Sequence, residues 1–86
     1  MRQLKFSELA LAGAKRLVPD ESRRQSLIFA IRFYLERDGH FRSRRCPAIP
    51  DRPLWIFGLA SFRILYEDTD PIFVWSILPA ADAESE

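Results

Sequence analysis

The first stretch of regularly spaced apolar residues predicts a short helix near the N-terminus. Between Ser7 and Pro19, apolar side chains recur at three- and four-residue spacing, which marks a helix with one buried side. They are Leu9, Ala10, Ala14, Leu17 and Val18. Ser7 supplies an N-cap and Pro19 ends the helix. Gly13 leaves room for a second helix to approach closely, and residues 2–6 are compatible with a short leading strand.

A second and longer helix is predicted from Asp20, which follows Pro19 as an N-cap, to Gly39. Its apolar stripe consists of Leu27, Ile28, Ile31, Tyr34 and Leu35. Phe29 and Phe33 lie four residues apart on another flank. We expect this helix to be covered on two sides, by the first helix and by a sheet. The alternative is that Phe29 and Phe33 form an uncovered flank that binds a second copy or a partner helix.

Three runs rich in aromatic and β-branched residues predict strands: PLWIF, SFRILYE and PIFVWSIL. The connections GLAS and DTDP are short, so both pairs are expected to be antiparallel hairpins. Alternation in the middle run places Phe62, Ile64 and Tyr66 on one face, expected to lie under the helices. It places Arg63, Leu65 and Glu67 on the other. In the third run, alternation groups Phe73, Trp75 and Ile77 on one face.

These elements predict an α+β fold in which a helical hairpin packs on a small three- to four-stranded antiparallel β-sheet. Residues 1–79 form a single domain, and residues 80–86 are expected to be a flexible acidic tail.

Residues 39–53 are expected to form a basic loop, because Pro47, Pro50 and Pro53 exclude a helix and a central strand. The loop carries four arginines, which are Arg42, Arg44, Arg45 and Arg52. One interpretation is a solvated loop. The other is an arm that contacts phosphates, with His40 and Phe41 available to stack on bases.

The charge distribution is strongly asymmetric although the net charge is only +1. Residues 1–53 carry twelve basic and six acidic residues, a charge of +6. Residues 54–86 carry only Arg63 against six acids, a charge of −5. A basic face of this kind can dock a polyanion or an acidic partner segment. The alternative is that the two charged regions neutralise each other within the fold.

Length and composition narrow the function classes. A chain of 86 residues with 48% hydrophobic and 29% charged residues is typical of one soluble globular domain. No apolar run approaches the roughly 18 residues of a membrane span, and we expect no signal peptide, no membrane partner and a cytoplasmic location. The chain has one cysteine, Cys46, and one histidine, His40, which argues against a disulfide framework and a zinc site, and no cofactor or metal is expected. Glu67, Asp68 and Asp70 are interpreted as a solvated hairpin tip.

The run FRILYE, residues 62–67, resembles the RelE/ParE superfamily of bacterial type II toxins. Family members carry a run of the form Tyr/Phe-Arg-apolar-apolar-Tyr-Glu on a penultimate strand. PLWIFGLAS resembles the preceding strand and turn, and LVPDESRRQSLIFAI resembles the second helix. The resemblance covers about residues 4–79. It implies a helical hairpin on a small antiparallel sheet.

Two activities are implied by this resemblance. RelE-like members cut messenger RNA on the ribosome, using sheet cations and a proton donor or acceptor. ParE-like members instead bind and block DNA gyrase, and an antitoxin protein neutralises either kind. Where nucleases place Lys or Arg on the preceding strand, this chain has Trp55 and Phe57, and its last strand ends SILPAADAESE. A toxin that binds its target is therefore preferred over one that cleaves RNA.

The candidate site residues follow from these alternatives. For target or RNA binding they are Arg42, Arg44, Arg45, Arg52 and Arg63. A metal-independent ribosome-dependent endoribonuclease would use Arg63, Arg45 and Arg52 as cations, with His40 or Tyr66 moving protons. Three roles stay open for Arg63: contact with phosphate, contact with the antitoxin, or a structural pair with Glu67 or an acidic residue of the tail. A third hypothesis is a non-toxic interaction module that forms a homodimer or hetero-oligomer through Phe29 and Phe33.

Overall fold

The computed structural model describes residues 3–38, 43–46 and 51–80. Several predictions fall outside these residues and stay predictions: the end of the second helix at Gly39, the roles of His40, Phe41 and Arg42, and the flexible tail over 81–86. Within the described ranges, no helix has the length and apolar character needed to cross a membrane.

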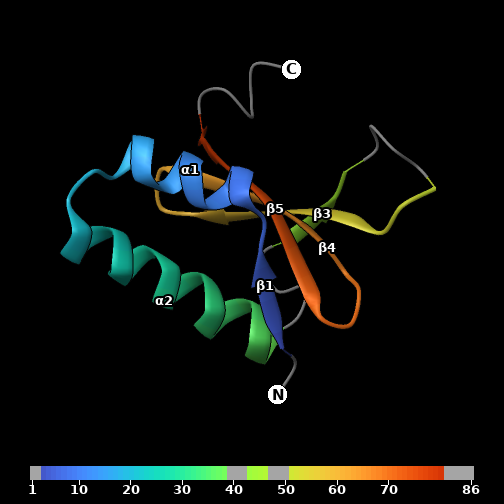
Figure 1. The fold of residues 1–86 in the computed structure, drawn as a ribbon. Coiled ribbons are helices and arrows are strands. Elements are labelled where there is room, and N and C mark those ends of the chain that lie inside the picture. The colour runs from blue at the N-terminus through green and yellow to red at the C-terminus, as the bar shows by residue number, and fades with distance from the viewer. Residues whose placement is uncertain (1–2, 39–42, 47–50, 81–86) are drawn as a thin grey trace.

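Two helices pack on a five-stranded mixed sheet whose strand order is β1-β5-β4-β3-β2 (Figure 1). The elements in chain order are β1 (Leu4–Phe6), α1 (Glu8–Leu17), α2 (Glu21–Asp38), β2 (Ser43–Arg45), β3 (Leu54–Leu59), β4 (Phe62–Glu67) and β5 (Ile72–Pro79). The α+β class is therefore as predicted.

The prediction of a three- to four-stranded antiparallel sheet is wrong in two respects. β1 pairs in parallel with β5, from Leu4 opposite Ile72 to Phe6 opposite Val74. A parallel pair needs a long connection, and here the intervening helices and strands provide it. In addition, β2 forms inside the predicted basic loop, antiparallel to β3. β2 lies before Pro47 and at the sheet edge, so the prolines do not prevent it.

FRILYE forms β4, the central strand of the sheet. The prediction that Phe62, Ile64 and Tyr66 face the helices is confirmed, because Ile64 and Tyr66 are buried in the core and Phe62 packs against it. Opposite them on β3, Phe57 is fully buried and its ring contacts that of Tyr34 on α2.

The predicted faces of β5 are wrong because the pairing of β4 with β5 shifts register between Leu65 and Tyr66. Leu65 is opposite Ser76 and Tyr66 is opposite Val74, so Trp75 is an extra residue on β5. Ile77 consequently joins Val74 in the core, while Trp75 does not.

α1 begins at Ser7, as predicted, and this serine also attaches the helix to β5. Its hydroxyl accepts a hydrogen bond from the Ala10 amide and donates one to the Trp75 carbonyl. Ala10, Gly13 and Ala14 form the buried side of the helix. A Cβ on Gly13 would lie 3.0 Å from the Ile77 carbonyl oxygen, so Gly13 permits close contact with the strand β5. The prediction that it lets a second helix approach is wrong.

Two features of the helices differ from the predicted apolar stripes. Leu9 is 66% exposed and does not belong to the buried side of α1. On α2, Leu27, Ile31 and Leu35 are buried against the sheet, but Phe29 and Phe33 are 69% and 42% exposed. The expectation that α2 is covered on two sides is therefore wrong. Phe29 and Phe33 do form an uncovered flank, and its binding to a second copy or a partner helix stays a prediction.

Candidate functional site

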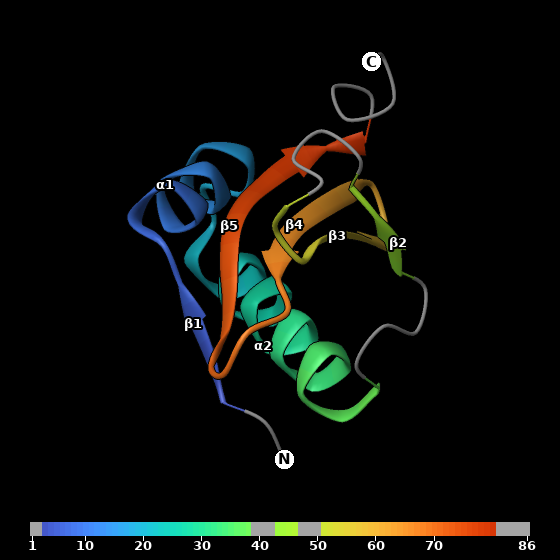
Figure 2. The ribbon, with the colours of Figure 1, turned by 90° about the vertical axis from the view of Figure 1, so that its right-hand side faces the viewer.

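The face of the sheet away from α2 carries three of the predicted site residues, Arg44, Arg52 and Arg63, and Figure 2 looks onto it. Cross-strand partners share a face, so Ile56 and Leu65 lie here together, as do Gly58 and Arg63. Arg44 is opposite Ile56 on the edge strand. We call this surface the open face; its side chains are Arg44, Arg52, Leu54, Ile56, Arg63, Leu65, Glu67, Phe73, Trp75, Ser76 and Leu78.

The open face carries a hydrogen-bonded cluster of Arg52, Glu67 and Trp75, which we call the Glu67 cluster. Glu67 Oε1 accepts hydrogen bonds from Arg52 Nη2 at 2.6 Å and from Trp75 Nε1 at 2.9 Å. The Arg52 guanidinium carbon also lies 5.7 Å from the centroid of the Trp75 ring. One carboxylate therefore holds both an arginine and a tryptophan in place.

Glu67 is only 8% exposed, so the prediction that it belongs to a solvated hairpin tip is wrong. The hydrogen bond from Arg52, followed by that from Trp75, lowers the pKa of Glu67 below its ordinary value, although burial acts in the opposite direction. The carboxylate is therefore ionised at neutral pH. It neutralises part of the positive charge that Arg52 brings to the open face.

A hollow of about 290 Å³ lies beside the Glu67 cluster. It is lined by Leu9, Arg52, Leu54, Leu65, Trp75 and Ser76. Its walls are mostly apolar, with the Arg52 guanidinium at one side. Tryptophan and arginine next to an apolar recess are the residue types that contribute most binding energy at protein–protein interfaces.

Arg63 lies beside the turn that joins β3 and β4. Its Nη1 donates to the Phe62 carbonyl at 2.9 Å and to the Ala60 carbonyl at 3.5 Å. Its guanidinium covers Gly58, where a Cβ would be 3.5 Å from Nη1. Ala60 has a φ of 53°, so these bonds help to hold a turn that alanine adopts at a cost.

The predicted pair of Arg63 with Glu67 is wrong, because Glu67 is bound by Arg52 and Trp75 instead. The reason is geometric. Residues four apart on a strand are separated by about 13 Å, whereas Arg52 enters the open face from the loop that leads into β3. The alternatives of contact with phosphate, with an antitoxin or with an acidic residue of the tail stay predictions, and the acidic residues of the tail lie outside the described residues.

Two other candidates lie away from the open face. Arg45 is opposite Trp55, and its guanidinium carbon is 5.7 Å from that ring, on the other side of the sheet. Tyr66 is 1% exposed, and its hydroxyl donates to Ser43 Oγ at 2.8 Å. This burial argues against Tyr66 as a proton donor to a bound substrate. The structure thus places Arg44, Arg52 and Arg63 on one face of the sheet and places Arg45 and Tyr66 on the other.

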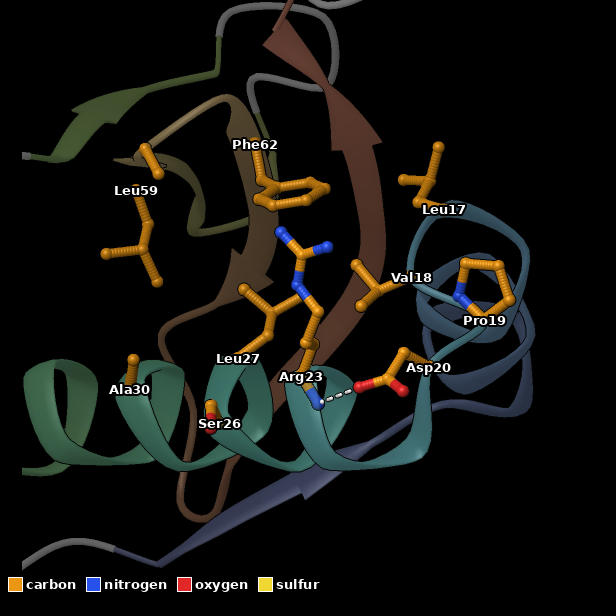
Figure 3. A pocket seen from close by; sticks show the side chains of 11 residues that line it. Leu17, Val18, Pro19, Asp20, Arg23, Ser26, Leu27, Ala30, Leu59 and Phe62 are labelled. Atoms are coloured by element: carbon orange, nitrogen blue, oxygen red, sulfur yellow. Dashed lines mark hydrogen bonds between the residues drawn. The ribbon is translucent and has the colours of Figure 1, made fainter.

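A second concave feature, the turn cavity, lies at the end of the helical layer (Figure 3). It has a volume of about 430 Å³ and is formed by the α1–α2 turn, the first half of α2 and the β3–β4 turn. Its apolar lining consists of Leu17, Val18, Pro19, Leu27, Ala30, Leu59, Ala60 and Phe62. The Arg23 side chain extends from α2 toward Phe62 and places a cation within this lining.

The edge of the turn cavity is fixed by two hydrogen-bonding side chains. Asp20 Oδ2 accepts from the Arg23 amide at 2.9 Å, which confirms Asp20 as the N-cap of α2. Arg24 Nη1 donates to the carbonyls of Val18 and Pro19, both at 3.1 Å. The turn between the helices is therefore tied to the first turn of α2 at the edge of the cavity.

Sequence reasoning missed the Glu67 cluster and the turn cavity. The partners of Glu67 come from a loop and from a strand with an extra residue, and strict alternation does not reveal either. No protein-family model matches the chain, and no curated protein matches it. The resemblance to RelE/ParE toxins consequently rests on the residues quoted for it and on the order of the elements.

Proposed function

We propose that the chain is a toxin-like component of a bacterial type II toxin–antitoxin system that acts by binding a cellular protein. The observation that carries this proposal is the Glu67 cluster and its apolar hollow on the open face. The position of FRILYE on the penultimate strand, under a pair of helices, agrees with the RelE/ParE resemblance. DNA gyrase, the target implied for ParE-like members, is the first protein to test.

Binding is preferred over cleavage because two arginines of the open face, Arg52 and Arg63, already have internal acceptors. Arg52 binds a carboxylate, and Arg63 binds two backbone carbonyls. A nuclease needs cations that turn to the developing charge of the transition state. An arginine and a tryptophan that are held rigidly are better suited to a protein interface, where fixed side chains lose little entropy on binding.

The alternative of a ribosome-dependent endoribonuclease is favoured by one observation. Arg44, Arg52 and Arg63 share one face of the sheet, which would suit a strand of RNA. His40 and Arg42, which this alternative also uses, lie outside the described residues.

We further propose that the turn cavity receives the antitoxin. An apolar side chain of the antitoxin would enter between Leu27 and Phe62, and a neighbouring carboxylate would pair with Arg23. A short acidic reading frame next to the gene for this chain would support this part of the proposal.

Mapping of transcript 5′ ends after induced expression distinguishes the two activities. We expect growth to stop without new 5′ ends within translated messages, and we expect purified protein to inhibit supercoiling by gyrase. New ends that disappear in an Arg63→Ala variant would contradict binding as the mode of action and would support the nuclease. The matched control is Arg16→Ala, which removes an exposed arginine from α1.

A further inference from the structure

The outer side of α2 carries two exposed aromatic side chains, Phe29 and Phe33, which we call the projection. The rings of Phe29 and Phe33 are stacked with centroids 6.4 Å apart. The Arg37 guanidinium carbon lies 4.8 Å from the centroid of the Phe33 ring, so a cation caps the projection. Burial of two such phenylalanines is a strong drive for association.

The same side of α2 has a shallow hollow toward its N-terminus. It is lined by Asp20, Glu21, Ser22, Gln25, Ser26 and Phe29 and has a volume of about 900 Å³. Ser22 and Ser26 leave it open because their side chains are small, and the Ser26 hydroxyl donates to the Ser22 carbonyl at 3.2 Å. Asp20 and Glu21 make this end acidic, and both are exposed.

The projection and the hollow lie at matching distances on either side of Phe29. Gln25 and Ser22 precede Phe29 by one and two helical turns, and Phe33 and Arg37 follow it by one and two turns. At about 1.5 Å per residue, each feature extends roughly 6 to 12 Å from Phe29. A two-fold axis beside Phe29 would therefore place each projection in the hollow of a second copy.

We propose that α2 is the interface of an antiparallel homodimer of this chain, centred on Phe29. In this arrangement Phe33 of one copy enters the hollow between Ser22 and Ser26 of the other. The Arg37 guanidinium then faces the carboxylates of Asp20 and Glu21. Both contacts occur twice because a two-fold interface uses the same surface on each copy.

Charge complementarity favours a second copy over an unrelated partner. The outer side of α2 carries both the cation, Arg37, and the anions, Asp20 and Glu21. Their spacing along the helix brings Arg37 opposite these carboxylates when a second copy of α2 runs in the opposite direction. Arg32 and Glu36 lie within 3.8 Å of each other on the same helix and so contribute little net charge. The interface lies on the side of the molecule away from the open face (Figures 1 and 2), so the inference does not depend on the protein proposed to bind there.

Sedimentation equilibrium of the full chain with paired charge variants tests the proposal. The wild-type chain should sediment as a dimer that dissociates on dilution. Phe29→Glu should sediment as a monomer, and its circular dichroism spectrum should show that it is folded. Glu21→Arg and Arg37→Glu should each weaken self-association about tenfold, because each variant places like charges opposite one another twice. An equimolar mixture of the two should restore association, since both contacts of the mixed dimer again join opposite charges.

The matched control is Lys15→Glu, an exposed charge reversal on α1 that should leave the dimer unchanged. Three results would each overturn the proposal. One is a wild-type monomer at about 1 mM, a concentration that populates even weak complexes. Another is a dimer that persists in Phe29→Glu. The third is a mixture of the charge variants that associates no better than either alone.

Discussion

Replacing Arg52 by alanine should destabilise the protein, because it leaves the Glu67 carboxylate nearly buried without its cation. Glu67 is 8% exposed, whereas the Arg52 side chain is 49% exposed. An exposed ion pair contributes about 0–1 kcal/mol, and breaking a fully buried one costs about 3–5 kcal/mol. The half-exposed arginine places this pair between the two, so we expect Arg52→Ala to lower the free energy of unfolding by about 2 kcal/mol.

Urea unfolding at neutral pH measures this loss as a lower midpoint at constant slope. Arg44→Ala is the matched control, since Arg44 is an exposed arginine on the same face, and we expect a change within about 0.5 kcal/mol. Trp75→Phe removes the second donor to Glu67 and should cost about 1 kcal/mol.

The decrease in the free energy of unfolding caused by Arg52→Ala should depend on pH. The pKa of Glu67 is lowered in the folded protein, so ionisation of this carboxylate stabilises the fold above its ordinary pKa. This stabilisation disappears as the pH falls through the lower pKa of the folded state. The difference between wild type and Arg52→Ala should therefore shrink in acid. A difference that is absent at neutral pH, or that is the same in acid, would refute this account of the cluster.

Three further substitutions test the packing that supports the two sites. Gly13→Ala should lower the free energy of unfolding by about 1 kcal/mol and therefore lower the thermal midpoint, because contact with the Ile77 carbonyl outweighs the better helix propensity of alanine. An increased midpoint would contradict this. Tyr66→Phe should cost about 1 kcal/mol in urea unfolding, since it removes the hydrogen bond to Ser43, and a neutral result would argue against that bond. Arg63→Ala should speed amide exchange at the Ala80 amide, which bonds the Ser61 carbonyl beside the turn that Arg63 holds, while exchange at Val18 stays unchanged; unchanged exchange at Ala80 would contradict that role.

Local features of this fold could be predicted from the sequence because they depend on neighbouring residues. Ser7 and Asp20 cap their helices through side-chain bonds to amides three residues later. The spacing of Leu27, Ile31 and Leu35 marks the buried side of α2. The alternation of Phe62, Ile64 and Tyr66 likewise identifies the covered face of β4.

Features that depend on distant parts of the chain could not be predicted in the same way. The parallel pairing of β1 with β5 joins the two ends of the chain, and no local pattern specifies it. Side chains in a strand alternate with period two, so the extra residue at Trp75 exchanges the two faces of β5 between the residues before it and the residues after it. The partners of Glu67 follow from that shift and from the course of the loop before β3.

The growth of cells after induction, for the wild-type chain and for Arg44→Glu, tests the central claim most directly. Arg44 is exposed on the open face, so reversal of its charge should disturb a bound protein without disturbing the fold. We predict that the wild-type chain stops growth and that Arg44→Glu, produced at the same level, allows growth to continue. Normal growth with the wild-type chain, or equal arrest with both chains, would contradict a toxin that acts through the open face.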